Sequence, residues 1–366
     1  MIELHDEDSV KAIQDFVRNN PDIEVYQYIR RGNNGEVYFG KRKKLADEVV
    51  LKFYWSHPNY DATEEAVILK GITHDNILKI YDLRFLPPNY AYFLTPKISG
   101  GDLQDIIDNK KLSTKESLEI ISGILIGLTE LHSAHKLVHR DLKPGNILIN
   151  LSDNRPIIAD LGAVKKIEDA NGFVTASKST YYYLPPESIL RNEYYFRSDI
   201  YQVGIIMFQL LGGFFPINNS YKWLKNSELK KVQAIKNSND QYWKFEEIIG
   251  QKIAKGKLIN LDTLPYYLDT SFKRVLNKAL HNQYDKRYRN TSLFLKDVHQ
   301  LLRSCPEYIE EPDKVIVNHN NGKQFQIYID KKGKVVLEKK ISDKEWRKDN
   351  NHNGTIESIL SIARKN

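Results

Sequence analysis

Alternating apolar and polar positions in the first part of the chain predict a small antiparallel sheet. Strand-like runs rich in Val, Tyr and Phe occupy residues 24–30, 35–41, 47–55, 77–85 and 90–97. A helical segment at residues 61–72 lies between the third and the fourth run. A helical extension within residues 1–22 precedes the sheet and stops at Pro21. The pattern therefore predicts a sheet with one main helix.

Helical periodicity takes over after residue 102. Within residues 114–135, apolar side chains recur at the spacing of one helix face, at Leu118, Ile121, Leu125, Leu128 and Leu131. The longest apolar run, residues 203–217, is interrupted by Gln209, a Gly pair and Pro216, and it is too short to span a bilayer. We interpret this run as a buried helix in a mainly helical region that extends to about Arg303.

The tail from Pro306 returns to strand-like patterning. Residues 314–340 predict three short strands joined at the turns "NNG" and "KKG", and residues 355–365 predict a closing helix. The acidic stretch 306–313 is interpreted as a linker. The resulting β-rich module could dock a partner, cover the rest of the chain, extend a sheet or act as a small cap on the helical region.

Composition and charge narrow the class of protein. The chain is 41% hydrophobic and 28% charged, which is typical of a globular protein. Its single cysteine, Cys305, excludes an intrachain disulfide and fits a reducing compartment, and the acidic N-terminus lacks the features of a signal peptide. We therefore expect a cytoplasmic protein. The net charge of +7 permits binding to nucleic acid, but the cations are dispersed, so nucleic acid is not a favoured partner.

The stretch "VHRDLKPGNILI", residues 138–149, concentrates unusual chemistry. It places two cations, a carboxylate, an imidazole and an amide between apolar runs fit for a hydrophobic core. A solvated turn needs no such set, whereas a site that handles phosphate and a divalent metal does. A further carboxylate, Asp160, follows the apolar "IIA", where burial is costly unless the carboxylate meets a cation.

These motifs, in this order, resemble the eukaryotic-type serine/threonine protein kinase family. The resemblance covers residues 23–303, and "DKRY" is similar to the bacterial members of that family. It implies an α+β fold of two lobes, a small antiparallel-sheet lobe at 23–95 and a larger helical lobe at 99–304. The C-terminal module at 305–366 would lie outside this kinase domain of residues 23–304, and the site would lie in the cleft between the lobes.

The resemblance assigns the reacting groups residue by residue. Asp141 would orient or deprotonate the substrate hydroxyl, and Lys143 would neutralise charge on the transferred phosphoryl group. Asn146 and Asp160 would bind Mg²⁺, for which Mn²⁺ could substitute. Lys143 also favours serine or threonine as the acceptor. The implied cofactor is ATP with Mg²⁺, and the implied partners are protein substrates.

The resemblance also assigns a nucleotide-binding set. Lys52 would hold the α and β phosphates and pair with Glu65, for which Glu64 is the rival. The remaining positions are the glycine-rich loop, the adenine pocket and the hinge: Gly32, Gly35, Val37, Val50, Thr95, Pro96, Ile98, Asp102 and Leu148. Arg30 stands where the first loop glycine is expected, which is a departure from the family pattern.

A third set belongs to the activation segment. Arg140 and Lys165 would bind a phosphate carried by Thr175 or Ser177, while Thr180 would tie the segment to the catalytic loop. The protein would then activate itself by autophosphorylation. The resemblance also assigns scaffold roles, in which Glu187 pairs with Arg287, Asp199 braces the catalytic-loop backbone and His139 packs in the core.

Two other functions stay open at this point. A pseudokinase scaffold or regulatory binding module draws support from Arg30, from Leu161 in place of phenylalanine and from Pro185 in place of alanine. Lys52, Asp141 and Asp160 are nevertheless all present. A kinase of small molecules would share the catalytic loop, but the full activation segment between Asp160 and Glu187 argues against it.

Overall fold

The structure of the chain is a computed structural model. The structure describes residues 11–30, 36–55, 69–86, 90–168, 172–177, 181–342, 345–349 and 354–365. The chain divides into two compact units. The first unit comprises Met1–Gly101 and Leu148–Val164, and the second comprises Asp102–Ile147 and Lys165–Asn366. Each unit is described by itself.

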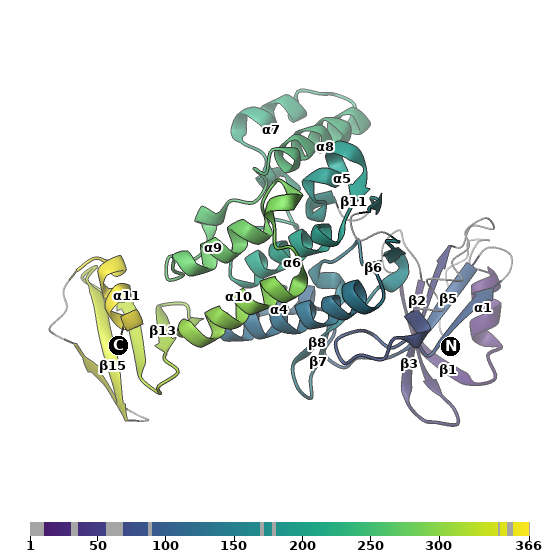
Figure 1. Cartoon of the computed structure of the whole chain (residues 1–366), viewed down its shortest axis with the longest axis horizontal. Helices are drawn as coiled ribbons and strands as arrows, with labels where there is room; N and C mark the ends of the chain where they lie inside the picture. Colours follow the sequence, from purple (N-terminus) through teal and green to yellow (C-terminus); the bar gives the residue numbers. More distant parts are fainter. Residues whose placement is uncertain are drawn as a thin grey trace. The chain divides into compact units, whose positions relative to one another are not determined.

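The first unit is built on a five-stranded antiparallel sheet with the strand order β1-β2-β3-β5-β4 (Figure 1). Its strands are β1 (Ile23–Arg30), β2 (Glu36–Arg42), β3 (Glu48–Trp55), β4 (Asp82–Leu86) and β5 (Tyr90–Pro96). The predicted runs are confirmed except that the strand expected at 77–85 begins only at Asp82. The reason is that Ile77 forms an isolated parallel bridge with Ile158 instead of joining the sheet. Most of the helix predicted at 61–72 lies outside the described residues.

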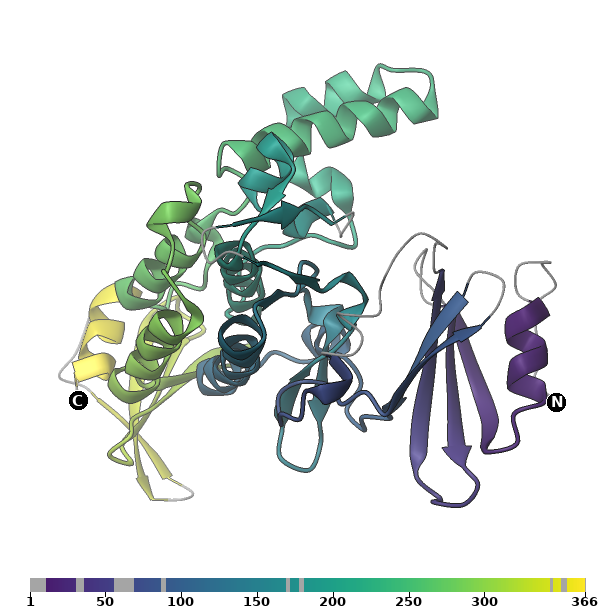
Figure 2. The ribbon, with the colours of Figure 1, turned by 45° about the vertical axis from the view of Figure 1, so that its right-hand side comes forward.

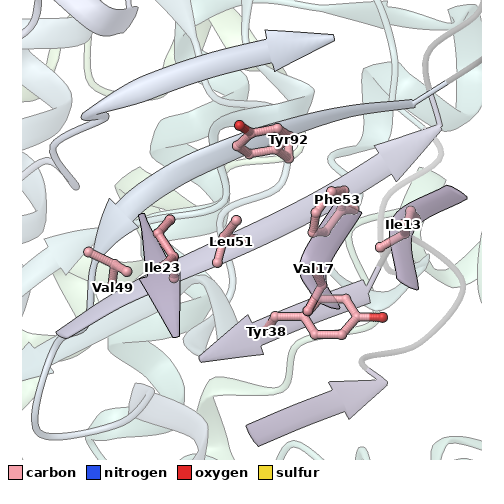
Figure 3. Packing of buried hydrophobic residues seen from close by; sticks show 8 residues of the cluster. All are labelled: Ile13, Val17, Ile23, Tyr38, Val49, Leu51, Phe53 and Tyr92. Atoms are coloured by element: carbon pink, nitrogen blue, oxygen red, sulfur yellow. The ribbon is translucent and has the colours of Figure 1, made fainter. Parts of the chain in front are cut away.

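The N-terminal helix α1 (Lys11–Arg18) belongs to the core of the first unit. Ile13 and Val17 are buried in one cluster with Phe53 of β3 (Figure 3). The ring of Phe16 lies 6.0 Å from that of Phe53. Because side chains alternate along a strand, Lys52 lies on the opposite face of the sheet from Phe53. The helix predicted as an extension therefore covers one face of the sheet and leaves the lysine face free of α1.

A short hairpin completes the first unit. Its strands are β7 (Ile147–Asn150) and β8 (Arg155–Ile158), followed by the 3₁₀ turn η4 (Leu161–Ala163). The backbone N–H of Gly100 donates to the carbonyl of Ile149 at 2.9 Å. A Cβ atom at position 100 would lie 2.2 Å from that carbonyl oxygen, so only glycine permits this approach.

The second unit is mainly helical (Figure 2). Its α-helices are α3 (Leu103–Asn109), α4 (Thr114–Thr129), α5 (Pro186–Arg191), α6 (Phe196–Leu210), α7 (Asn226–Gln233), α8 (Ser238–Ala254), α9 (Thr270–Ala279) and α10 (Thr291–Ser304). Short helical turns are the π turn η2 (Glu130–Ala134) and the 3₁₀ turns η3 (Pro144–Asn146), η5 (Tyr181–Tyr183), η6 (Ser220–Trp223), η7 (Leu261–Thr263) and η8 (Tyr284–Lys286). Two strand pairs are β6 (Leu137–Val138) with β9 (Lys165–Lys166), and β10 (Val174–Thr175) with β11 (Glu193–Tyr194). No helix in the described part of the chain has the length and apolar character needed to span a bilayer.

Helices α4 and α6 form the centre of the second unit. A capping box starts α4, because Ser113 and Glu116 each bond the backbone of the other. Along α6, nearly every side chain is buried. The helix predicted over residues 203–217 is too long, since α6 ends at Leu210. Gly212, whose φ of +83° favours glycine, follows the helix end and turns the chain away.

The C-terminal residues form a five-stranded meander and a helix. The strands are β12 (Glu307–Glu310), β13 (Lys314–Asn318), β14 (Gln324–Ile329), β15 (Val335–Ser342) and β16 (Glu345–Lys348), and α11 (Ile356–Lys365) packs on β14 and β15 (Figures 1 and 2). The closing helix and the turns at Gly322 and Gly333 are confirmed. The linker prediction for 306–313 is wrong, because Tyr308 pairs with Val317 and makes this stretch a strand.

Strand β12 also packs on the start of α4. The backbone N–H of Tyr308 donates to Thr114 Oγ1 at 2.9 Å, and the Tyr308 ring stacks on Tyr267 with 5.4 Å between centroids. Arg364 of α11 donates to the Tyr308 hydroxyl at 3.1 Å and to the Tyr267 carbonyl at 2.7 Å. These contacts favour the cap among the alternatives for the C-terminal module.

Candidate functional site

The loop that follows β6 holds one carboxylate in a defined position. Lys143 Nζ donates to Asp141 Oδ2 at 2.8 Å, and Asn146 Nδ2 donates to the same oxygen at 2.9 Å. Asn146 Nδ2 also bonds the Asp141 carbonyl at 2.7 Å. Asp141 Oδ1 is buried and has no hydrogen-bond partner among the described residues. One oxygen is thus fixed by the protein, and the other can accept a proton or hydrogen bond from outside.

Side chains of α6 hold the backbone of this loop. Asp199 accepts from the N–H groups of His139 at 2.8 Å and Arg140 at 3.0 Å. Gln202 Oε1 accepts from the N–H of Leu142 at 2.8 Å. Arg140 has a φ of +69°, an uncommon angle for a side-chain-bearing residue, which these bonds stabilise. The bracing role predicted for Asp199 is confirmed, and the burial of His139 agrees with a structural role.

The buried Asp199 carboxylate is ionised in spite of its surroundings. Burial by itself raises the pKa of Asp199, but the hydrogen bond from His132 and the charge of that imidazole lower it, and the resulting pKa is below the ordinary value. His132 Nε2 lies 2.8 Å from Asp199 Oδ2. A charged acceptor holds backbone donors more strongly than a neutral one, so the loop that carries Asp141 is firmly anchored.

The first unit joins a second carboxylate to a lysine. Lys52 of β3 forms an ion pair with Asp160. Asp160 follows the buried Ile158 and Ala159 and has a φ of +57°. A cation therefore does meet this carboxylate, as its costly position after an apolar run requires. Leu161, which replaces the family's phenylalanine, is buried and fills an apolar position.

The register of the first sheet gathers four of the predicted nucleotide-binding residues. Val37 pairs with Lys52, and Val50 pairs with Thr95. Directly paired residues share a face of the sheet, as do residues two apart in one strand. All four side chains therefore lie on the face opposite α1. This face presents two valines, a buried threonine and a cation, a set suited to an adenine ring and a phosphate.

The segment that follows β5 lies next to β7. Pro96 ends β5, and the backbone of residues 100–101 exchanges two hydrogen bonds with Ile149 at 2.9 and 3.0 Å. This pairing brings the chain around Ile98 to the strand that carries Leu148. Asp102 begins the second unit, where its side chain accepts from the N–H of Asp105 at 3.0 Å. The structure thus gives Asp102 the role of an N-cap for α3.

Several predicted residues lie outside the described part of the chain. They are Gly32 and Gly35 of the glycine-rich loop, Glu65 with its rival Glu64, and Thr180 of the activation segment. Arg30 ends β1, and its Cα pairs with that of Glu36.

The activation segment is tied to the rest of the second unit by backbone pairing. Lys165 pairs with Val138 of β6, and Thr175 of β10 pairs with Glu193 of β11. Arg140 Nη1 donates to the carbonyl of Thr175 at 2.8 Å. Thr175 is exposed and Ser177 is half-buried. The guanidinium of Arg140, which was predicted to bind a phosphate, therefore contacts the segment that holds both candidate phosphate acceptors, Thr175 and Ser177.

Oxygen donors suited to Mg²⁺ are present in both units. Both contacts of Asn146 Nδ2 are with acceptors, so the amide nitrogen is fixed there and the side-chain oxygen is the atom left for a cation. The Asp160 carboxylate is the corresponding donor of the first unit. Carboxylate and amide oxygens are hard ligands of the kind that Mg²⁺ prefers, so the residues fit the ion. Within the described residues there is no cluster of three or more His, Cys, Asp or Glu side chains that could hold a metal.

Sequence reasoning missed two residues that hold the loop carrying Asp141. Gln202 lies inside the buried α6, and the fully buried Tyr194 precedes that helix. The hydroxyl of Tyr194 lies 2.6 Å from Asp199 Oδ1 and 2.8 Å from Gln202 Oε1. An amide between apolar residues of a buried helix is the signal that could have revealed Gln202, because such a group needs partners.

Comparison with known proteins agrees with these features. The family model of the protein kinase domain matches residues 23–299. Calcium-dependent protein kinase 4 of Plasmodium berghei is 32% identical over 246 residues, which cover 62% of this chain and 44% of that protein. The probable serine/threonine-protein kinase HSL1 of Saccharomyces cerevisiae is 29% identical over 245 residues, covering 64% of this chain and 16% of that protein. The chain thus matches less than half the length of these relatives. On the family match and the arrangement around Asp141, the chain belongs to the eukaryotic-type protein kinase family.

Proposed function

We propose that this chain is a serine/threonine protein kinase that transfers the γ-phosphoryl group of MgATP to protein hydroxyls. The observation that carries the proposal is the Asp141 carboxylate. Lys143 and Asn146 fix one of its oxygens, while the other is buried without a partner among the described residues. A buried, unsatisfied carboxylate oxygen is costly in a purely structural loop. A substrate hydroxyl would satisfy it.

The residues divide the work of phosphoryl transfer among them. Asp141 Oδ1 would accept the hydrogen bond of the attacking hydroxyl and orient it. Lys143, held beside Asp141, would neutralise negative charge that develops on the transferred group. Asn146 and Asp160 would hold Mg²⁺, which when bound neutralises phosphate charge. Little covalent chemistry is required of the protein, so positioning is the main contribution of these groups.

Nucleotide binding would use the face of the sheet opposite α1. Val37, Val50 and Leu148 would contact adenine, and Lys52 would exchange part of its pairing with Asp160 for the phosphates. Gly32, Gly35, Thr95, Pro96, Ile98 and Asp102 complete the proposed set, and Glu65 is the proposed second partner of Lys52. The shared face of Val37, Val50, Lys52 and Thr95 supports this part of the proposal.

Activation would occur by autophosphorylation at Thr175 or Ser177. A phosphate there would find the guanidinium of Arg140, which already contacts the Thr175 carbonyl, and the ammonium of Lys165 could supply a second cation. Thr180 would keep its proposed structural role. The activity would belong to residues 23–304, with residues 305–366 acting as a cap on the second unit.

The central test replaces single side chains of the site. Asp141→Asn, Lys52→Met and Asp160→Asn should each lower phosphoryl transfer to a serine peptide by about a thousandfold or more, since each removes a charge needed in the transition state. Asp262→Asn, which removes an exposed carboxylate, is the control and should retain full activity. Thermal melting of each variant checks the fold.

Two outcomes would contradict the proposal. Undiminished transfer by Asp141→Asn would show that this carboxylate does not act in the reaction. Nucleotide binding by the wild type, measured by calorimetry, without any transfer to peptides or to itself would support the alternative, a pseudokinase scaffold.

A further inference from the structure

Tyr194 contributes a hydroxyl group to the support of the catalytic loop. The residue is fully buried in β11, and its hydroxyl lies 2.6 Å from Asp199 Oδ1 and 2.8 Å from Gln202 Oε1. Burial raises the pKa of Tyr194 well above its ordinary value, so the hydroxyl keeps its proton and can act as a donor at any working pH. The shorter contact, to a carboxylate, receives the larger share of that single proton.

Both acceptors of this hydroxyl also hold the backbone beside Asp141. Asp199 accepts from the N–H groups of His139 and Arg140, and Gln202 accepts from that of Leu142. The orientation of the Gln202 amide is determined by its neighbours, because its Nε2 donates to the Tyr183 carbonyl at 3.3 Å. The Tyr194 hydroxyl therefore shares its hydrogen-bond acceptors with the backbone N–H groups of the residues on either side of Asp141, the proposed catalytic carboxylate.

The ring of Tyr194 contacts the segments that flank the loop. It forms a buried cluster with Val138 of β6 and Ile167, and Val174 of β10 packs against this cluster. Val174 is also the direct cross-strand partner of Tyr194 in the β10–β11 pair. The ring of Tyr194 thus contacts the activation segment, while its hydroxyl contacts Asp199 and Gln202, which hold the loop carrying Asp141.

We propose that Tyr194 is a positioning residue that couples the β10–β11 strand pair to the loop carrying Asp141. The proposal rests on the proposed function, because it concerns the placement of Asp141 for phosphoryl transfer. Without the hydroxyl, Asp199 and Gln202 lose a shared donor that fixes their side chains. The loop would then sample positions in which Asp141 is displaced, and small displacements of a reacting group lower the rate strongly.

The test compares two buried tyrosines that each donate to an acidic or amide oxygen. Tyr194→Phe keeps the ring and removes only the hydroxyl. Tyr288→Phe is the matched control, because Tyr288 is 1% exposed and its hydroxyl donates to Asp297 Oδ2 at 2.8 Å. We expect kcat to fall roughly tenfold in Tyr194→Phe and less than about twofold in Tyr288→Phe. The KM for ATP should change little in either variant, since neither residue belongs to the proposed nucleotide-binding set.

A second measurement does not depend on activity. Amide hydrogen exchange of residues 139–142, followed by mass spectrometry, should be faster in Tyr194→Phe than in the wild type or in Tyr288→Phe. Gln202→Met leaves the Tyr194 ring in its cluster, removes the acceptor of the Leu142 N–H, and should raise exchange at the same residues. If Tyr194→Phe fails to fold, Gln202→Met carries the test.

The outcomes separate this proposal from the proposed function. A wild type that transfers no more phosphate than Asp141→Asn would contradict the proposed function, and the exchange rates would then decide the role of Tyr194. An active wild type with unchanged kcat and unchanged exchange in Tyr194→Phe would overturn the positioning role alone. An equal loss of kcat in Tyr194→Phe and Tyr288→Phe would also overturn it, because the loss would then reflect general destabilisation.

Discussion

Arg287 and Glu187, separated by 100 residues in the chain, form a buried ion pair with two parallel hydrogen bonds of 2.8 Å each. Their side chains are 0% and 2% exposed. Ser198 donates to the same carboxylate, and the Arg287 guanidinium lies over the ring of Tyr201 at 4.7 Å. The pair predicted from the sequence is therefore confirmed. It joins the start of α5 to the loop before α10 in a setting from which water is excluded.

Removing one partner of this pair should destabilise the protein strongly. Glu187→Gln or Arg287→Met alone should lower the free energy of unfolding by about 3–5 kcal/mol, because each leaves the other charge buried and unpaired. The double variant should lose less than the sum of the two. Urea denaturation of all four proteins gives the coupling energy.

An exposed ion pair provides the control for this comparison of single and double variants. Lys244 and Glu247 are 37% and 52% exposed, and Lys244→Met should cost less than about 1 kcal/mol. Strictly additive losses at Glu187 and Arg287 would show that the two residues do not act as a pair.

The two candidate phosphate acceptors differ in their electrostatic surroundings. Thr175 lies directly opposite Glu193 in the β10–β11 pair. Hydrogen bonds from Tyr195 and Arg191 lower the pKa of Glu193, so its carboxylate is charged at neutral pH. Like charges directly opposite each other are unfavourable in a sheet, so a phosphate on Thr175 would be repelled. Ser177 lies beyond the end of β10 and avoids this opposition.

We therefore predict that Ser177 is the main acceptor. Mass spectrometry of the protein after incubation with MgATP should find phosphate mostly at Ser177, and Ser177→Ala should lose most of the gain in activity that autophosphorylation provides. Glu193→Gln, which removes the opposing charge, should increase the phosphate found at Thr175. Dominant phosphorylation of Thr175 with Glu193 intact would contradict the electrostatic argument.

The elements that the sequence predicted are those with a strong local signal. Short apolar runs rich in β-branched and aromatic residues located the strands of the first sheet, and the motif around Asp141 indicated the protein kinase family that the comparison shows. Strand β12 was missed because two of its four residues are acidic and only one, Tyr308, is deeply buried. Its burial depends on Tyr267 and Thr114, which are distant in sequence, and no local pattern reveals such contacts.

The same limit applies to the packing of the N-terminal helix and to the residues that hold the loop carrying Asp141. The pattern over residues 8–20 predicted a helix but gave no sign that Ile13 packs on Phe53. Tyr194 and Gln202 carry no motif of their own, and their roles emerge only when the fold brings them to Asp199. Long-range hydrogen bonds to backbone groups are invisible to periodicity, since any residue supplies the same N–H.

Stability should depend on pH through Asp199 in a defined direction. The pKa of Asp199 is lowered in the folded protein: burial opposes this shift, and the hydrogen bonds from His132 and Tyr194 together with the nearby imidazoles outweigh burial. A lowered pKa means that ionised Asp199 contributes stability above its unfolded pKa of about 3.9 and that this contribution is lost as the pH falls through the folded pKa.

Asp199→Asn should therefore be less stable than the wild type by about 3–5 kcal/mol at pH 7, and the difference should shrink as the pH approaches 3. Urea denaturation at pH 7, 5, 4 and 3 measures it. Asp262→Asn serves as the control for the general effect of losing a carboxylate. A difference that stays constant or grows on acidification would show that Asp199 does not act through its charge.

The C-terminal module is held on the second unit by the contacts of Tyr308. Tyr308 is 1% exposed and lies between Tyr267, Thr114 and Arg364, so Tyr308→Ala removes a buried ring and several polar contacts. We expect a loss of about 3–5 kcal/mol in the free energy of unfolding, the usual range for truncating a buried aromatic side chain. Truncation after Ser304 should lower the melting temperature for the same reason.

The only cysteine of the chain reports on this docking directly. Cys305 lies at the junction between α10 and β12, where burial raises the pKa of its thiol, so alkylation by iodoacetamide should be slow in the native wild type. Tyr308→Ala should speed alkylation by about tenfold or more, since local opening of the module exposes the thiol. Ile329→Ala is the matched control from the same sheet, because Ile329 is 61% exposed and its truncation should leave the rate unchanged. Equal alkylation rates in the three proteins, together with an unchanged melting temperature after truncation, would show that the module is an independent appendage. In that case, docking of a partner would become the better hypothesis for residues 305–366.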